Sequence, residues 1–169
     1  SAFDNDPEFE EAAGIIERLR QRAKIFGRRF AVKLTNTLIV ENRSDFLPPS
    51  EKIAYLSGAP LHVIAMHLVA RFRDEFEDTL PISFSAGIDR LNYPDAVRLG
   101  LAPVTVCTDL LRQGGYGRLQ AYATELGARM DAAGARNLAE FVTNDVDSYL
   151  DALDLDSRYR PEHLPKPVR

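Results

Sequence analysis

The sequence predicts an α/β domain in which short parallel strands alternate with helices along the chain. Two observations lead to this fold class. Stripes of apolar residues at helical spacing alternate with short apolar runs, and two of these runs end in small and hydroxyl residues. The apolar runs are close to continuous, as expected for strands that are covered on both faces or closed into a barrel. Regular alternation of strand and helix predicts parallel strands joined by right-handed crossovers.

Composition and charge limit the kind of protein. The chain has 169 residues, 45% of them hydrophobic and 27% charged, which is enough to bury one core and too little for two. Its net charge of −4 gives no overall attraction to nucleic acid or to an anionic membrane, so we expect neither partner. No apolar run approaches the roughly 18 residues of a membrane span and no signal-peptide pattern opens the chain, which favours a cytoplasmic location.

The first half of the chain predicts a helix, a strand and a second helix. Asp6-Pro7 is a typical helix start, and apolar residues continue at helical spacing until Gly27 ends the pattern. Residues 30–35 are expected to form a strand, and the polar stretch 42–52 a loop. The strongest helical stripe follows and consists of Leu61, Ile64, Ala65, Leu68, Val69, Phe72 and Phe76.

The second half repeats this pattern. It predicts strands at residues 81–85 and 103–107, and helices at residues 93–99, 119–130 and 138–153. We therefore expect one domain over residues 1–157 and an extended, unpacked tail over residues 158–169, which contains three prolines. Three or four strands are too few to close a complete (β/α)8 barrel, which needs about 250 residues.

Both predicted strands of the second half end in residues that suit the binding of an anion. Ser85-Ala86-Gly87 follows the first strand and Thr108-Asp109 the second. In parallel α/β folds, ligands bind beyond the carboxyl ends of the strands, where small residues let backbone N–H groups face a phosphate and the next helix adds its dipole. The same residues are also common in turns that merely reverse the chain and cap helices. Spacing alone does not decide between these two interpretations.

A family resemblance favours the binding interpretation. Four motifs carry it in order, namely VKLTNT (32–37), YLSGAPL (55–61), SFSAGID (83–89) and PVTVCTDLLRQGGYGRL (103–119). Together they resemble the flavin-binding barrel of dihydroorotate and dihydropyrimidine dehydrogenases. They are more closely similar to the barrel domain of the large flavin, iron–sulfur and NADPH oxidoreductases that are labelled selenate reductase or glutamate-synthase-type subunit. The resemblance covers roughly residues 30–130 and implies the last three or four βα units of a TIM-type barrel, plus a C-terminal helix.

The resemblance implies a phosphate site at the two strand ends. In that family, backbone amides at the ends of the last two barrel strands hold the phosphate of FMN, which points here to Ala86, Gly87, Cys107 and Thr108. Asp109 departs from the small neutral residue that is usual in the family. A carboxylate within about 5 Å of a phosphate in a partly dry site costs several kcal/mol unless a cation intervenes. Arg112 could supply that cation, or Asp109 could instead cap the next helix.

Further cofactor contacts are implied on the earlier motifs. Lys33 resembles the strand lysine at the pyrimidine edge of the flavin, where a cation stabilises the reduced ring. Asn36 and Thr37 resemble an Asn-Thr pair that contacts substrate or flavin. Ser57-Gly58 matches the end of the family's Gly-Gly-x-Ser-Gly turn, although residues 54–56 have lost its leading glycines.

These features lead to two functional hypotheses. The first is an FMN-binding segment of a multidomain NAD(P)H-dependent oxidoreductase, either dihydropyrimidine dehydrogenase-like or glutamate synthase-like. Iron–sulfur clusters, FAD and NADPH would then lie on other domains or subunits, which would be its partners, and the isolated chain would be inactive and bind FMN weakly. The second is a flavin-free, non-catalytic scaffold domain that mediates assembly with partner domains. A flavin spectrum of the parent protein distinguishes the two.

The remaining candidate side chains give weaker signals. Cys107 ends an apolar strand, and a buried free cysteine usually behaves as a small hydrophobe. His62 and His67 are five residues apart, so they do not share a metal-binding helix face and are expected at the surface or in a groove. A single cysteine also excludes a disulfide framework and a thiolate-ligated metal site built from this chain alone. We therefore expect no metal site and no catalytic residue.

A partial barrel leaves strand edges and inward side chains uncovered. The strands expected at residues 30–37, 81–85 and 103–107 are rich in Val, Phe, Ile and Leu, so their inner face would form an apolar patch. We expect the isolated chain to cover this patch by forming a two-fold homodimer. The alternative is a monomer in which a terminal helix, for example the apolar stretch 138–150, folds across the open side.

Overall fold

A small parallel sheet lies at the centre of the structure, a computed structural model that describes residues 6–42 and 47–159. Strands β1 (Val32–Leu34) and β4 (Ile82–Phe84) pair in parallel, with Lys33 opposite Ser83. A parallel bridge between Phe84 and Val104 continues the sheet. The other elements are α1 (Phe9–Ile25), β2 (Leu38–Glu41), β3 (Ile53–Leu56), α2 (Ala59–Phe76), α3 (Tyr93–Arg98), α4 (Leu119–Ala132), α5 (Leu138–Phe141), α6 (Val146–Leu155) and the 3-10 turns η1 (Glu77–Thr79), η2 (Thr108–Leu111), η3 (Gly115–Arg118) and η4 (Ser157–Tyr159).

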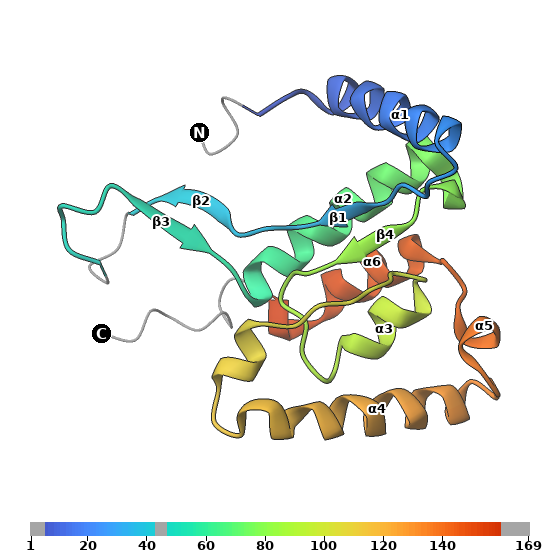
Figure 1. The fold of residues 1–169 in the computed structure, drawn as a ribbon. Coiled ribbons are helices and arrows are strands. Elements are labelled where there is room, and N and C mark those ends of the chain that lie inside the picture. The colour runs from blue at the N-terminus through green and yellow to red at the C-terminus, as the bar shows by residue number, and fades with distance from the viewer. Residues whose placement is uncertain (1–5, 43–46, 160–169) are drawn as a thin grey trace.

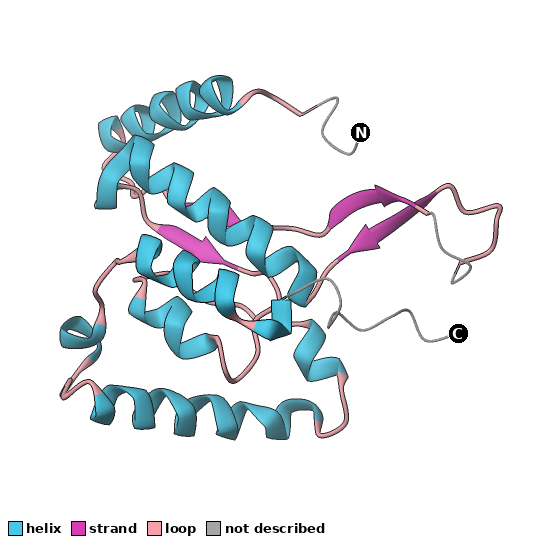
Figure 2. Ribbon diagram, turned by 180° about the vertical axis from the view of Figure 1, so that it is seen from behind, coloured by secondary structure: helices cyan, strands magenta, loops and turns pink. Residues whose placement is uncertain are grey.

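Helices cover one face of this sheet and leave the other open. Helices α2 and α6 lie behind the strands in Figure 1 and in front of them in Figure 2, and they pack against each other. Side-chain burial therefore alternates along the strands, and Leu34, Ile82 and Phe84 are the buried residues on the helix-covered face. On the open face, Lys33 is exposed and Ser83 is half-buried. The predictions of continuous apolar strands and of an apolar inner face are therefore wrong.

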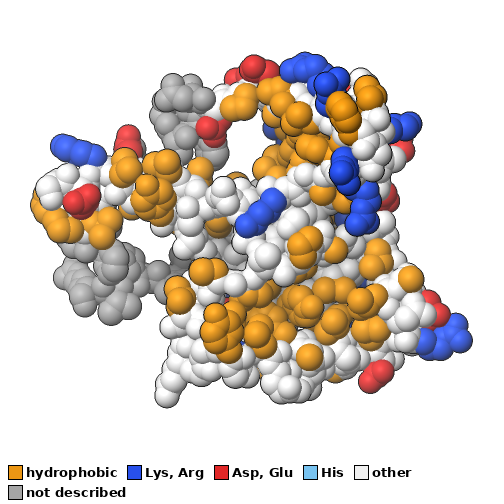
Figure 3. Space-filling model, in the orientation of Figure 1, with side chains coloured by type: hydrophobic (Ala, Val, Ile, Leu, Met, Phe, Trp, Pro, Cys, Tyr) orange, Lys and Arg blue, Asp and Glu red, His pale blue; other side chains and the backbone are white. Residues whose placement is uncertain are grey.

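Hydrophobic side chains on the open side gather elsewhere. Figure 3 shows them over α3 and the region between β4 and α4, rather than on the strands. Helix α6 packs on α2, so the C-terminal helix does not close the open side as the monomer hypothesis required. The expected strand at 103–107 is reduced to the bridge at Val104, with the Thr105 N–H donating to Phe84 O over 2.9 Å.

A β-hairpin extends away from the body of the molecule (Figure 1). Strands β2 and β3 pair antiparallel, with Ile39 opposite Tyr55. The loop predicted over residues 42–52 agrees with the described residues 42 and 47–52, but the strands on either side of it were not predicted. Residues 43–46 of this connection lie outside the described part of the chain. The outward face of the hairpin carries Glu41 and three exposed apolar side chains, Ile39, Ile53 and Tyr55, of which Tyr55 is 63% exposed.

The predicted C-terminal helix is interrupted. Val142 is extended (φ −71°, ψ 124°) and ends α5, and Asn144 follows with a positive φ of 57°. The Asp145 carboxylate then accepts the Ser148 N–H at the start of α6. The tail expected to be unpacked from Arg158 onward also differs, because Tyr159 stacks on His62 with ring centroids 5.3 Å apart. Residues 160–169 lie outside the described part. The helices predicted at 93–99 and 119–130 are confirmed as α3 and α4.

Candidate functional site

A pocket of about 460 Å³ lies at the carboxyl ends of the parallel strands. The segment after β1, the turn before α2, the turn after β4 and the segment after Val104 all contribute to it. Eight of the nine cofactor-binding candidates line this pocket, namely Asn36, Thr37, Ser57, Gly58, Ala86, Gly87, Cys107 and Thr108. Segments that lie far apart in the sequence therefore meet at one site.

The lining is neutral and rich in hydrogen-bonding groups. Besides the candidates, the hydroxyl-bearing residues Thr35, Ser85 and Thr105 contribute, together with Leu61, Ile88 and Leu111. Among the described residues that line it, none carries an acidic or a basic side chain. Hydroxyl and backbone N–H groups without a competing carboxylate suit a bound anion.

The turn after β4 packs tightly on the start of α2. Gly87 has a positive φ of 55°, and a Cβ atom there would lie 2.4 Å from Gly58 O and 2.9 Å from Ala59 N. Only glycine allows this approach, because any larger residue would collide with backbone atoms. The start of α2 and the 85–88 turn therefore lie in the same corner of the pocket.

Donors in this turn are free to bind a ligand. The backbone N–H groups of Ala86, Gly87 and Ile88 have no hydrogen-bond acceptor among the residues that the structure describes. All three residues line the pocket. Unpaired N–H groups in a glycine-containing turn beside a helix start are a common way of binding phosphate.

Asp109 is directed away from the pocket, which it does not line. Its side chain is buried and accepts hydrogen bonds from Arg118 Nε at 3.0 Å, Arg118 Nη2 at 2.8 Å and the Tyr122 hydroxyl at 2.8 Å. Burial alone would raise the pKa of Asp109, but the hydrogen bonds from Arg118 and Tyr122 outweigh it and hold the pKa below its usual value. The expected conflict with a phosphate is therefore absent, and so is the alternative helix cap.

Two arginines lie beside Asp109, and only Arg112 was predicted there. Arg112 lies 3.7 Å from the carboxylate, but Arg118 makes the shorter, two-pronged contact. Arg118 immediately precedes α4 and lies nine positions after Asp109, across two 3-10 turns. No helical or strand periodicity relates two such positions, so sequence reasoning missed this pair.

Lys33 and Cys107 differ from their expected positions. Lys33 is exposed on the open face of β1 and is not part of the pocket lining. Cys107 is exposed and lines the pocket, whereas a buried, inert cysteine was expected. The reason is that the third strand is only a bridge at Val104, so Cys107 lies beyond the sheet.

His62 was expected near the surface but is fully buried on α2. Its Nδ1 lies 2.7 Å from Ala86 O and its Nε2 lies 2.9 Å from the Tyr149 hydroxyl. Burial lowers the pKa of His62 to about 4, although the bond to Ala86 opposes this shift. The available sequence signal was its helical spacing with Met66 and Val69, which are also fully buried.

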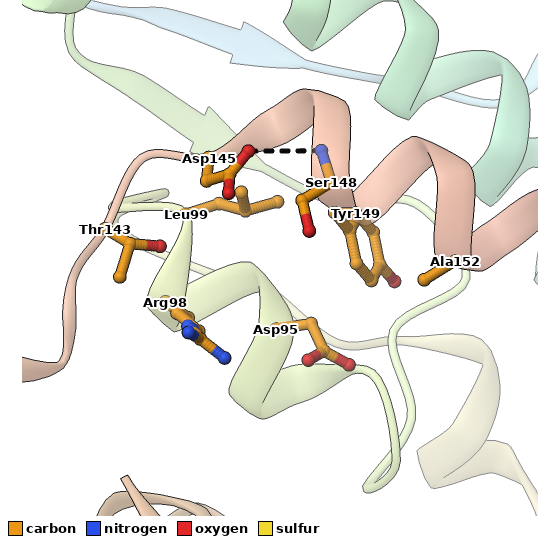
Figure 4. Close-up of a pocket in the computed structure, with 8 residues that line it drawn as sticks. All are labelled: Asp95, Arg98, Leu99, Thr143, Asp145, Ser148, Tyr149 and Ala152. Carbon is orange, nitrogen blue, oxygen red and sulfur yellow. Dashed lines mark hydrogen bonds between the residues drawn. The ribbon is translucent and has the colours of Figure 1, made fainter.

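A second, smaller pocket of about 160 Å³ lies between α3 and α6 (Figure 4). Both of its carboxylates already have structural roles. Asp95 pairs with Arg129 at 2.5 Å, although burial raises the pKa of this carboxyl group, and Asp145 caps α6 through Ser148. With both carboxylates already engaged, this pocket is a weaker candidate than the strand-end pocket.

Two further kinds of feature are absent from the described residues. In residues 6–42 and 47–159, no group of three or more His, Cys, Asp or Glu side chains could hold a metal ion. No helix within the same ranges is both long and apolar enough to cross a membrane.

Comparison with known proteins places the chain in a family. The family described as "Oxidoreductase YgfK, N-terminal TIM-barrel domain" matches residues 1–160. The chain belongs to this family. It is 40% identical over 125 residues to YgfK, a candidate oxidoreductase of Escherichia coli (strain K12), and equally so to YgfK of Escherichia coli O157:H7. The match covers 74% of the chain but only 12% of either relative. No solved structure matches the chain.

Family membership confirms the coarser expectations. The fold is that of a TIM-barrel domain, of which the described strands form a part, and the domain belongs to an oxidoreductase family. The partial sheet with α2 and α6 on one face agrees with this architecture. The pocket at the strand ends therefore lies where TIM-barrel enzymes have their active sites. The short name of the family is YgfK_N.

Proposed function

We propose that this YgfK_N-type chain is the FMN-binding segment of a multidomain NAD(P)H-dependent oxidoreductase, and that its strand-end pocket holds the FMN phosphate. One observation carries the proposal. Four segments of the chain converge on a single neutral pocket in which the N–H groups of Gly87 and Ile88 have no partner among the described residues. Bound FMN would supply the electron-transfer chemistry of an oxidoreductase.

The residues present fit a phosphate group. The unpaired N–H groups of the 85–88 turn can donate to phosphate oxygens, and the hydroxyls of Ser57 and Thr108 lie in the same lining. The described lining contains no cation, so the favourable charge would come from backbone dipoles. Helix α2 starts at the pocket and is 18 residues long, and a helix start stabilises an anion by about 0.3–1 kcal/mol or more.

The rest of the reaction belongs to other parts of the protein. The chain covers about an eighth of the length of the relatives that it matches, which leaves ample room for further domains there. We propose that FAD, iron–sulfur clusters and the NADPH site lie on such domains or on partner subunits. This chain then binds and orients one flavin and contributes no catalytic acid or base.

A scaffold function is the second candidate, and two observations favour it. Lys33 lies outside the pocket, and residues 54–56 form part of strand β3 rather than a glycine turn beside the pocket. A domain that had lost its flavin could keep the barrel fold for assembly with partner domains. It would then bind no flavin at the strand ends.

Flavin analysis of the native full-length protein tests the proposal. We expect a yellow protein that releases FMN on acid denaturation, identified by chromatography. Thr108→Val removes a pocket hydroxyl without changing side-chain shape and should lower FMN occupancy. Thr124→Val, on the exposed side of α4, should leave occupancy unchanged. A colourless protein, or one that contains only FAD, would contradict the FMN proposal and favour the scaffold.

A further inference from the structure

Two backbone carbonyl groups of the 85–88 turn accept hydrogen bonds from buried side chains. Ala86 O lies 2.7 Å from Nδ1 of His62, and a carbonyl oxygen can only accept a hydrogen bond. Nδ1 must therefore carry the proton, and Nε2 must accept the hydrogen of the Tyr149 hydroxyl at 2.9 Å. Both ring nitrogens are satisfied by the neutral imidazole in one tautomer only. The ring is thereby fixed as a donor to the turn.

Asn92 holds the next carbonyl in the same way. Its side chain is fully buried, and its Nδ2 donates to Gly87 O at 2.9 Å and to the Tyr159 hydroxyl at 2.8 Å. Its Oδ1 accepts the Asp89 N–H at 2.8 Å. Both donors and the acceptor of this amide have partners, so its orientation is determined.

Peptide geometry links these bonds to the pocket. In a trans peptide the C=O and N–H bonds point in opposite directions. The peptide whose oxygen bonds His62 ends in the Gly87 N–H, and the peptide whose oxygen bonds Asn92 ends in the Ile88 N–H. Each N–H group therefore points away from the side chain that bonds the oxygen of its own peptide. Both lack an acceptor among the described residues, and both residues line the pocket.

We propose that His62 and Asn92 are positioning residues that aim the N–H groups of Gly87 and Ile88 at the bound phosphate. The proposal rests on the proposed FMN function and extends it to residues that do not touch the ligand. It also gives a role to the C-terminal elements, because Tyr149 on α6 and Tyr159 on η4 hold His62 and Asn92 in place. These tyrosines stabilise the turn from the covered face of the sheet.

Two substitutions of His62 separate positioning from simple packing. An asparagine amide nitrogen can take the place of Nδ1 and keep the bond to Ala86 O, whereas a glutamine amide nitrogen reaches the place of Nε2 and loses it. Both remove the ring and should lower thermal stability by similar amounts. Flavin-stripped, native full-length protein is titrated with FMN and with riboflavin, which lacks the phosphate. His67→Gln, an exposed position on the same helix, is the control.

The expected result is specific to the phosphate. His62→Gln should weaken FMN binding by about tenfold, with riboflavin binding unchanged, because one lost hydrogen bond corresponds to about that factor. His62→Asn and His67→Gln should stay within about threefold of the wild type for both flavins. Tyr149→Phe removes only the hydroxyl that fixes the tautomer, so it should fold and show a smaller loss for FMN alone.

Distinct outcomes overturn the two proposals. If the wild type binds FMN but His62→Gln and Tyr149→Phe bind it equally well, the positioning role is wrong and the FMN proposal stands. The same holds if FMN and riboflavin are lost in equal measure, or if Asn and Gln have equal effects. If His62→Gln fails to fold, unchanged FMN binding by Tyr149→Phe still overturns the positioning role. A wild type that binds no FMN overturns the proposed function, and the positioning role with it.

Discussion

Acidification should destabilise the chain through His62, and the structure predicts by how much. This side chain is fully buried, and burial lowers its pKa from 6.5 to about 4. The folded-state pKa lies below the unfolded value, so the unfolded chain takes up a proton first as the pH falls. The stability that neutral His62 contributes is therefore complete above about pH 7 and is lost as the pH falls from 6.5 towards 4.

The size of the effect follows from the same two values. A shift from 6.5 to about 4 corresponds to about 3 kcal/mol once the pH is below both values, at about 1.4 kcal/mol per pH unit. At pH 5, about 2 kcal/mol of this is already lost relative to pH 7. Because domains are typically stable by only about 5–15 kcal/mol, a loss of this size is easy to measure.

Urea unfolding at pH 7 and pH 5 provides the assay. His62→Asn does not titrate in this range, so its stability should fall by about 2 kcal/mol less than that of the wild type between the two values. The carboxylates are common to both proteins and cancel in the comparison. His67→Gln should keep the full pH dependence of the wild type. Equal pH dependence in His62→Asn and the wild type would refute the reasoning.

Three further predictions concern the pocket and the open face. Gly87→Val should abolish FMN binding in the native full-length protein, because its side chain would collide with Gly58 O. Gly134→Val, at a similar φ of 68° but with open space around it, should leave FMN binding unchanged. FMN retained by Gly87→Val would rule out a phosphate site at the 85–88 turn. The 169-residue chain alone should bind FMN more weakly than about micromolar in equilibrium dialysis, because one face of its sheet is uncovered, and tighter binding would show that the chain suffices. Sedimentation equilibrium of the same chain should give a dimer, through the hydrophobic side chains of the open side in Figure 3, and a species of 18.9 kDa would show a monomer instead.

Sequence reasoning located the pocket because strand ends of parallel α/β folds converge. The turns after β1, β4 and Val104 all contain small or hydroxyl residues, and parallel pairing brings their carboxyl ends to one edge of the sheet. The helices α2, α3 and α4 were predicted for a similarly local reason, since a helical stripe needs only neighbouring turns. The identity of the bound group is not contained in these patterns, so it remains a proposal.

The errors come from contacts between distant segments. Hairpin β2–β3 connects through a polar stretch that predicts only a loop, and its strands gain support only from each other. Asp109 was expected near the phosphate because it follows Thr108. Its actual partner, Arg118, lies across two 3-10 turns and could not be found from a local pattern. His62 was expected near the surface, although Tyr149, 87 residues away, completes its hydrogen bonds in the core. No local pattern carries that information.

A crystal structure of the native full-length protein with its flavin would test the central claim most directly. The phosphate of FMN should lie in the pocket between Gly58, Gly87 and Thr108, with oxygen atoms about 3 Å from the backbone nitrogens of Gly87 and Ile88. Asp109 should remain paired with Arg118, directed away from the phosphate. A flavin bound elsewhere, with this pocket filled only by water, would contradict the claim.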